Sequence, residues 1–176
     1  MTDAVDTSEQ AVRLNALSLD EATEALARCC GAARWVEAML ARLPFASRAA
    51  LFAAAADVWA AMNPDDLREA FAQHPEIGEN LAELREKFAA TADWASAEQG
   101  ATAQASEATL IALRNGNQAY RARFGYSFIV CATGKSADEM RALLEARLGN
   151  APELELGIAA AEQAEITRLR LEKLER

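Results

Sequence analysis

The run Phe128-Ile129-Val130-Cys131-Ala132-Thr133 decides the fold class, because it is the one segment of the chain that resembles a β-strand. A short apolar run of this kind fits a buried strand or part of a buried helix, and periodicity does not distinguish the two. No second convincing strand exists elsewhere to pair with it, so a sheet is not expected. We predict an extended segment buried among helices, with backbone groups that are partly available to bond another molecule.

The composition of the chain around this run favours helices. The chain has 176 residues, of which 52% are hydrophobic and only 6% aromatic. Much of the apolar content is alanine, which has the highest helix propensity, whereas strands prefer β-branched and aromatic residues. A chain of this length is large enough to form one hydrophobic core. The prediction is therefore an all-α fold, a single compact helical domain at residues 14–176 that follows a flexible N-terminus at residues 1–13.

Capping residues and helix breakers divide the chain into about eight helices. Serine and asparagine side chains accept hydrogen bonds from the free N–H groups of a first helical turn. Glycine and proline end a helix, because glycine adopts left-handed conformations and proline disfavours a helical residue before it. The predicted N-caps are Ser18, Ser47, Asn63, Ser106 and Ser136, the predicted stops are Gly31, Pro44, Pro75, Gly125 and Gly149, and the last helix begins at Pro152.

Charge and cysteine content exclude several classes of protein. The net charge of −9 would repel nucleic acids and anionic membranes, so neither is an expected partner. No stretch of about 18 apolar residues is free of charges, and the N-terminus lacks the pattern of a signal peptide. The adjacent Cys29 and Cys30 are a poor disulfide candidate, and a single histidine leaves no convincing transition-metal site. We expect a soluble cytoplasmic protein with reduced thiols and no bound metal.

The stretch Ala72-Gln73-His74-Pro75-Glu76-Ile77-Gly78 contains the only histidine of the chain. The helix that begins at Asn63 must end at His74, because proline follows. The imidazole is therefore expected near a helix C-terminus, whose carbonyl groups favour its protonated form. Histidine is the side chain that ordinarily titrates near neutral pH, so His74 is a candidate acid or base. The alternative is an ordinary structural histidine.

An arginine in the last helix lies on the apolar side of its helical wheel. With about 100° per residue and Ile166 at zero, Arg170 falls near 40°, between Leu169 and Leu174. Arg168 falls near 200°, on the side expected to face solvent. A buried guanidinium is costly unless an anion or similar group meets its donors. Arg170 therefore either extends past the leucines, pairs with an internal carboxylate, or binds an anionic ligand.

Three other candidates carry weaker signals. Glu98, in Trp94-Ala95-Ser96-Ala97-Glu98-Gln99-Gly100, is either a catalytic carboxylate or a surface charge that complements a helix N-terminus. A nucleophilic Cys30 or Cys131 would need a nearby base, and His74 is the only histidine that could serve. The apolar neighbours of Cys131 favour an inert core thiol.

Taken together, these segments resemble the 2-oxo-4-hydroxy-4-carboxy-5-ureidoimidazoline (OHCU) decarboxylases of urate breakdown. The resemblance extends from Leu14-Asn15-Ala16-Leu17-Ser18 to Arg168-Leu169-Arg170-Leu171. It rests on the order and spacing of several motifs rather than on one. They are Cys29-Cys30-Gly31 with Arg34-Trp35, Phe71-Ala72-Gln73-His74-Pro75-Glu76-Ile77-Gly78, Trp94 with Glu98-Gln99, Tyr120-Arg121-Ala122-Arg123-Phe124-Gly125, Phe128 to Gly134, and Glu145-Ala146-Arg147-Leu148-Gly149-Asn150.

The resemblance implies an all-α enzyme that needs no cofactor and releases carbon dioxide from OHCU to give (S)-allantoin. By the same resemblance, His74 and Glu98 form the catalytic acid/base pair, Arg170 anchors the substrate anion, and the active form is a homodimer. The partner implied is the small ureidoimidazoline substrate. The implied substrate-binding residues are Pro75, Gln99, Phe128, Ile129, Val130, Cys131, Ala132 and Arg170.

Two other functions remain open at this point. One is hydrolysis of a related ureide, in which His74 activates water. The other is a helical binding module, in which His74 and Arg170 are structural. Catalysis requires His74, Glu98 and Arg170 to converge around one cavity of small-molecule size.

Overall fold

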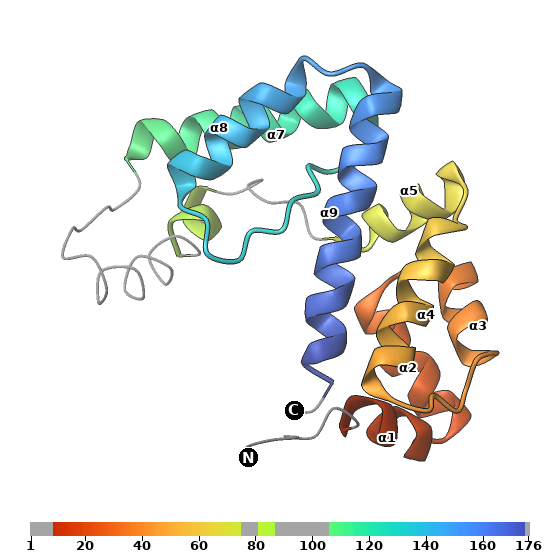
Figure 1. Cartoon of the computed structure of the whole chain (residues 1–176). Helices are drawn as coiled ribbons and strands as arrows, with labels where there is room; N and C mark the ends of the chain where they lie inside the picture. The colour runs from red at the N-terminus through yellow and green to blue at the C-terminus, as the bar shows by residue number, and fades with distance from the viewer. Residues whose placement is uncertain (1–8, 75–80, 87–105, 175–176) are drawn as a thin grey trace, which may run out of the picture. The chain divides into compact units, whose positions relative to one another are not determined.

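A computed structural model of the chain describes residues 9–74, 81–86 and 106–174. Every regular element within these ranges is a helix, and residues 81–86 are helical as well, so the predicted all-α class is confirmed. The named helices, labelled in Figure 1, are α1 (Glu9–Ala16), α2 (Leu19–Cys29), α3 (Ala33–Leu40), α4 (Arg48–Ala60), α5 (Pro64–Ala72), α7 (Glu107–Phe124), α8 (Ala137–Leu148) and α9 (Pro152–Glu172).

The chain divides into two compact units. The first contains Met1–Gln73 together with Ala160–Arg176, and the second contains His74–Ala159. The helix α9 begins in the second unit and ends in the first. The boundaries of a single domain at residues 14–176 stay a prediction. The prediction of a flexible segment at residues 1–13 was wrong for residues 9–13, because these belong to α1, which buries Ala11 and Leu14.

The predicted N-caps are confirmed. Ser18, Asn63 and Ser136 each form a capping box, in which the side chain accepts from the N3 backbone and the N3 carboxylate accepts from the N-cap backbone. Ser47 and Ser106 accept single hydrogen bonds from Ala50 and Thr109. These contacts join residues two or three positions apart, which explains why the local sequence predicts them.

The first unit packs its helices around large apolar side chains. The helix α3 contacts α2, α4 and α5, and α1 contacts α2 and α4. Trp35 of α3 is fully buried and donates from Nε1 to the carbonyl oxygen of Ala55 in α4 at 3.2 Å. Trp59 of α4 donates to the carbonyl oxygen of Ala160 in α9 at 2.9 Å. The indole donors therefore join three helices of this unit.

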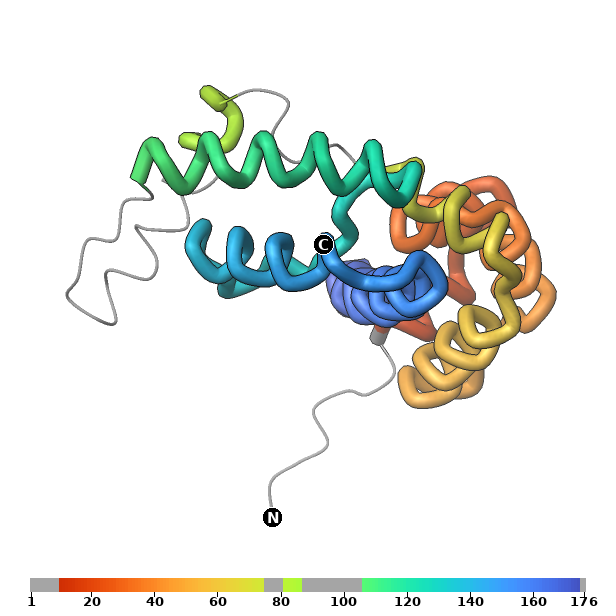
Figure 2. Tube along the Cα trace, turned by 90° about the horizontal axis from the view of Figure 1, so that it is seen from above, coloured from red at the N-terminus to blue at the C-terminus, as the bar shows by residue number. Residues whose placement is uncertain are grey.

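The second unit is built on α7 and α8, which lie side by side in Figures 1 and 2. Gly116 permits their close approach, because a Cβ at that position would lie 2.6 Å from Cδ2 of Leu144. The helix α7 ends at Gly125, whose φ of 82° is the left-handed conformation that glycine tolerates. The chain then reaches α8 without forming a strand, and Phe128, Ile129 and Val130 are buried. The prediction of a buried segment at residues 128–133 is therefore confirmed for residues 128–130, whereas Thr133 is exposed in a turn.

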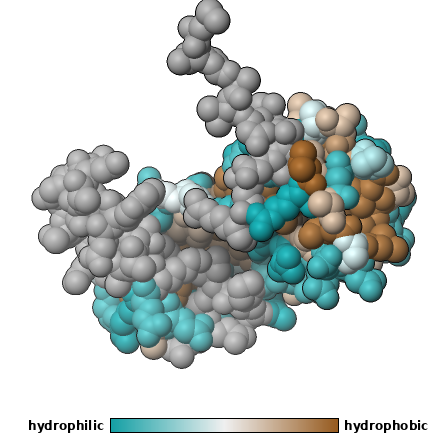
Figure 3. Space-filling view, turned by 90° about the horizontal axis from the view of Figure 1, so that it is seen from below, coloured by the Kyte–Doolittle hydropathy of each residue, from teal (hydrophilic) through white to brown (hydrophobic). Residues whose placement is uncertain are grey.

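The surface of the first unit mixes apolar and polar side chains. Figure 3 shows brown and teal atoms interspersed on the face seen from below. Val12 and Leu19 are 60% and 68% exposed, and such scattered apolar residues are ordinary on protein surfaces. Within the described part of the chain, no helix has the length and apolarity that crossing a membrane requires.

Candidate active site

His74 lies in the turn directly after α5. That helix begins with the Asn63 capping box and has Pro64 at its first position. It ends at Ala72, where the N–H of the C-cap residue Gln73 bonds to the carbonyl oxygens of Ala70 and Phe71. His74 is partly buried in the following bend. The strong start of α5 and the proline after His74 therefore place the imidazole at the carbonyl end of a short helix, as predicted.

The residue before His74 packs against the loop between α2 and α3. A Cβ added to Gly31 would lie 2.1 Å from Cγ and 2.7 Å from Cβ of Gln73. The loop is tied to α5 a second time, because the Ala33 N–H donates to Glu69 at 3.2 Å. The glycine after the two cysteines therefore permits the close approach of the residue next to His74.

Arg170 of α9 contacts the end of α2, next to this loop. Its Nη1 lies 3.4 Å from the carbonyl oxygens of both Arg28 and Cys29, at the C-terminal end of α2. The side chain is partly buried, and within the described residues it forms no ion pair with a carboxylate. A cation is favoured at a helix C-terminus, so this position stabilises α2 while it leaves the other guanidinium nitrogens for a further partner.

Arg168 differs from Arg170 as the helical wheel predicted. Its side chain is exposed and pairs with Glu165 at 2.6 Å and with Glu172 at 2.5 Å, both on α9. These partners lie three and four residues away, the usual spacing of ion pairs on one helix face. The wheel therefore separated a surface arginine from one that faces α2.

The adjacent cysteines are poor nucleophiles. Cys29 and Cys30 are 1% and 0% exposed. Burial raises the pKa of Cys29 to about 12, although the charge of Arg170 lowers it, and burial likewise raises the pKa of Cys30 to about 11. Thiolate is therefore scarce at neutral pH. Cys131 is half-exposed rather than a core residue as the sequence suggested.

The segment from Phe128 to Ala132 has several of its carbonyl groups already bonded. The carbonyl oxygen of Ile129 accepts from Nη1 of Arg147 at 2.9 Å. That of Cys131 accepts from Nζ of Lys135 at 2.6 Å, and that of Ala132 accepts from the Lys135 N–H at 3.1 Å. These three carbonyl groups are therefore not available to another molecule as predicted, because the side chains of Arg147 and Lys135 and the Lys135 N–H already bond them.

A buried network behind this segment was not predicted. The carboxylate of Glu155 is fully buried and accepts from the Tyr120 hydroxyl at 2.5 Å, from Nε of Arg147 at 2.8 Å and from Nδ2 of Asn150 at 2.8 Å. The Arg147 side chain is 8% exposed, and its guanidinium lies 4.6 Å from the centre of the Phe128 ring. Burial and the bond to Glu155 raise the pKa of Tyr120, so the phenol stays a donor.

A signal for Arg147 was present in the sequence. Met140, Leu144 and Arg147 are spaced by four and three residues, so they share one face of α8, and all three are buried. This is the argument that singled out Arg170. Helical periodicity applied to residues 137–148 identifies Arg147 as a second arginine on an apolar helix face, but it does not identify the partner Glu155.

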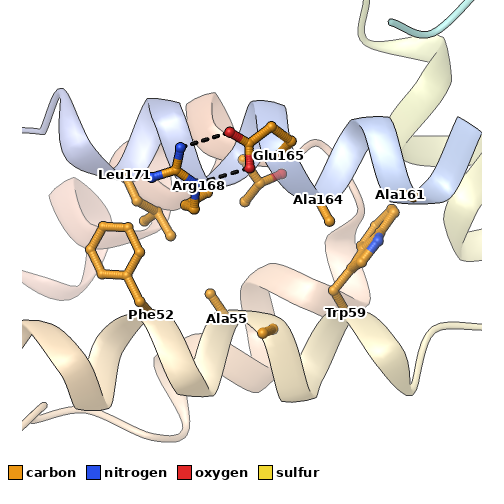
Figure 4. A pocket seen from close by; sticks show the side chains of 10 residues that line it. Phe52, Ala55, Trp59, Ala161, Ala164, Glu165, Arg168 and Leu171 are labelled. Atoms are coloured by element: carbon orange, nitrogen blue, oxygen red, sulfur yellow. Dashed lines mark hydrogen bonds and ion pairs between the residues drawn. The ribbon is translucent and has the colours of Figure 1, made fainter. Parts of the chain in front are cut away.

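A pocket of about 270 Å³ lies between α4 and α9 in the first unit (Figure 4). Figure 4 shows Phe52, Ala55 and Trp59 on one side and Ala161, Ala164 and Leu171 on the other, with the Glu165–Arg168 pair beside them. None of the residues predicted for the site lines this pocket. Its wall is mostly apolar, and the two charged residues that line it, Glu165 and Arg168, pair with each other, so it is not the predicted site.

Some predicted residues lie outside the described ranges, namely Pro75, Glu98 and Gln99. The convergence of His74, Glu98 and Arg170 therefore stays a prediction. Among the described residues, no three histidine, cysteine or acidic side chains are grouped as metal ligands.

Comparisons with known proteins give consistent matches. A family model described as OHCU decarboxylase matches residues 15–172. The chain is 37% identical over 148 residues to the uric acid degradation bifunctional protein TTL of Arabidopsis thaliana. That match covers 83% of this chain and 45% of the plant protein, so the chain spans less than half the length of this curated relative.

Solved structures are also similar. A crystal structure of OHCU decarboxylase in the presence of (S)-allantoin matches at 35% identity and a TM-score of 0.68, over 85% of this chain and 95% of that chain. A crystal structure of (S)-allantoin synthase matches at 20% identity and a TM-score of 0.67, over 93% of this chain and 53% of that one, a likeness of fold alone.

Proposed function

The chain belongs to the OHCU decarboxylase family, and from this premise we propose that it catalyses the decarboxylation of OHCU to (S)-allantoin. The observation that carries the proposal is the family match over residues 15–172, which includes His74, Glu98 and Arg170. A solved OHCU decarboxylase that is 35% identical, and was crystallised in the presence of (S)-allantoin, supports it. The activity is that of a carbon–carbon lyase in urate degradation.

The proposed reaction needs no cofactor, because the substrate itself accepts the electrons. The carboxylate of OHCU is attached to C4, which also carries the hydroxyl group and lies beside C5, the ring carbon that is double-bonded to a ring nitrogen and can accept electrons. When the bond to the carboxylate breaks, its electron pair moves onto the ring as an enolate-like anion, and carbon dioxide leaves. A proton then adds on one face to C5, the neighbouring carbon that carries the ureido group, and the 4-hydroxyl loses its proton to become the carbonyl group of (S)-allantoin. The protein must hold the carboxylate, stabilise the developing charge and control the protonation.

His74 and Glu98 are the proposed acid/base pair. An imidazole and a carboxylate within hydrogen-bonding reach share protons, and together they can bond the 4-hydroxyl of OHCU and deliver the proton to carbon. The position of His74 at the carbonyl end of α5 supports this role, since it presents a partly buried imidazole beside a rigid helix. Pro75 and Gln99 are proposed to contact the substrate beside these two residues.

Arg170 is the proposed anchor of the substrate anion. A guanidinium cannot lose its charge at physiological pH and bonds a carboxylate through two nitrogens at once. Arg170 lies against the carbonyl end of α2, at Arg28 and Cys29, and Gln73, the residue before His74, lies against Gly31 just after that helix. The common site of the anchor and the acid/base pair is proposed from the family match, which includes all three residues.

The backbone from Phe128 to Ala132 is proposed to bind the ring and ureido groups. With several carbonyl groups of the segment already bonded, the N–H groups are the donors that we assign to substrate. We also propose a homodimer that acts in the cytoplasm. The family supports the dimer, and three free thiols fit a reducing compartment.

The proposed activity is tested by generating OHCU in place. Urate oxidase and hydroxyisourate hydrolase convert urate to OHCU, and circular dichroism follows the appearance of (S)-allantoin. Addition of this protein is expected to accelerate the optically active product. Racemic allantoin at the uncatalysed rate would contradict the proposal, and a different ureide product would favour hydrolysis.

Replacing Arg170 by alanine is expected to lower kcat/KM for OHCU by roughly 30- to 1000-fold, as for loss of about 2–4 kcal/mol of binding to a charged partner. The reason is that the substrate carboxylate would lose its charged partner. The measurement is steady-state kinetics in the coupled assay, with far-ultraviolet circular dichroism to establish folding.

Arg168→Ala is the matched control for this variant. Arg168 lies two residues away on the same helix, but it is exposed and pairs with Glu165 and Glu172. Its removal is expected to leave kcat/KM near the wild-type value. Equal losses in the two variants would argue against the anchor.

A further inference from the structure

Two cationic side chains bond to backbone carbonyl groups of the segment that follows α7. Arg147 of α8 bonds the carbonyl oxygen of Ile129 at 2.9 Å, and Lys135 bonds that of Cys131 at 2.6 Å. Arg147 also lies over the Phe128 ring. The backbone is therefore held at two alternate peptide groups by charged donors, a stronger restraint than a neutral hydrogen bond supplies.

Because the peptide group is planar, these two carbonyl contacts also fix the directions of the Val130 and Ala132 N–H bonds. The carbonyl of Ile129 and the N–H of Val130 belong to one trans peptide unit, in which they point in opposite directions. The carbonyl of Cys131 and the N–H of Ala132 are related in the same way. Since Arg147 and Lys135 hold the carbonyls, the Val130 and Ala132 N–H groups point away from the two cations.

Arg147 is itself held firmly. Glu155 binds its Nε at 2.8 Å, and the same carboxylate accepts from Tyr120 and Asn150, so its oxygens are well bonded. The Tyr120 ring also packs against Phe128, with ring centres 5.2 Å apart. Phe128 and Ile129 are therefore held by Tyr120 of α7 and Arg147 of α8, and both of these residues bond to Glu155 of α9.

We propose that Arg147, Glu155, Tyr120 and Lys135 are positioning residues that aim the Val130 and Ala132 N–H groups at acceptor oxygens of the ureidoimidazoline substrate. This inference rests on the proposed function and assigns a task to residues that the reaction itself does not use. Preorganised donors of this kind cost no reordering when the substrate binds.

The test uses (S)-allantoin as a stable probe of binding. In the wild-type protein, the amide resonances of Val130 and Ala132 are expected to shift on addition of (S)-allantoin. Arg147→Lys keeps the charge but loses the planar fork that reaches both Glu155 and Ile129. We expect it to weaken (S)-allantoin binding and raise KM for OHCU by about tenfold, the effect of one lost hydrogen bond, with a smaller change in kcat.

Tyr120→Phe and Lys135→Met provide independent variants. Tyr120→Phe removes one bond to Glu155 without changing ring packing, so it tests the network even where Arg147→Lys fails to fold. Lys135→Met removes the bond from Lys135 to the carbonyl of Cys131, and the Ala132 resonance is expected to lose more of its response than that of Val130. Both variants are expected to raise KM more than they lower kcat.

Arg123→Lys is the matched control. Arg123 also bonds a backbone carbonyl, that of Asn150 at 3.0 Å, and lies over the Phe124 ring, but it is exposed, and neither its hydrogen bond nor its ring contact involves residues 128–132. It should bind (S)-allantoin like the wild type. The inference would be overturned if folded Arg147→Lys, Tyr120→Phe and Lys135→Met proteins all bound (S)-allantoin with wild-type affinity. It would also be overturned if the Val130 and Ala132 resonances did not shift on addition of (S)-allantoin. Neither result would contradict the proposed decarboxylase activity. A wild-type protein inactive on OHCU would remove the proposed function and this inference together.

Discussion

The His74→Ala variant is expected to lose nearly all acceleration of (S)-allantoin formation, with kcat lower by roughly 100- to 10,000-fold, the usual contribution of a general acid or base. No other histidine exists in the chain to replace it. Because His74 is only partly buried in a turn after α5, its removal should leave the fold intact. The measurement is circular dichroism of the product, with OHCU generated in place.

Two further observations make this result specific. His74→Asn keeps a polar side chain of similar size but does not titrate near neutral pH, so it should be as inactive as His74→Ala. Added imidazole should restore part of the activity of the alanine variant, because it can supply the missing proton carrier. Wild-type kcat in a well-folded His74→Ala protein would exclude a catalytic role.

The Glu155→Ala variant is expected to lose about 3–5 kcal/mol of folding free energy, since the charge of Arg147 would remain buried without its partner. The Glu155 side chain is fully buried and accepts hydrogen bonds from three donors, and the Arg147 side chain is only 8% exposed. Urea unfolding followed by far-ultraviolet circular dichroism measures the change. The midpoint of thermal unfolding should fall by roughly 6–20 °C.

Two comparisons distinguish a lost ion pair from a general effect of mutation. Glu153→Ala removes an exposed acid two residues away in the first turn of α9, and it should change stability little. The double variant Arg147→Met/Glu155→Leu removes both charges, so it should recover much of the stability that Glu155→Ala loses. If the double variant were the less stable protein, the attraction between the charges would exceed the cost of burying them.

Much of the fold follows from short stretches of sequence. An acidic residue three positions later predicts Ser18 and Ser136 as N-caps, and a proline and two acids after Asn63 predict that N-cap. All three form capping boxes. Arg168 and Arg170 were separated by helical periodicity, which depends only on residues within two turns. The prediction of a flexible end was wrong for residues 9–13, because these polar residues belong to α1, in which Ala11 is buried.

The candidate site was less accessible to such reasoning. The sequence predicted a buried, extended segment at residues 128–133, but not that Arg147 and Lys135 would occupy its carbonyls. Arg147 could have been noticed on the apolar face of α8. Its partner could not, since Glu155 lies in another helix beyond a turn, and its burial depends on Tyr120, which is 35 residues away.

The sequence alone therefore determined the helical class, the starts of the capped helices and the family, because caps, breakers and motifs are recognised from neighbouring residues. Only the tertiary structure decided which charges are buried and which backbone carbonyls of residues 128–132 are already bonded. Burial and hydrogen bonding of those groups depend on distant residues that packing brings together. The cations behind residues 128–132 belong to this second class, since each acts through a contact that exists only in the folded chain.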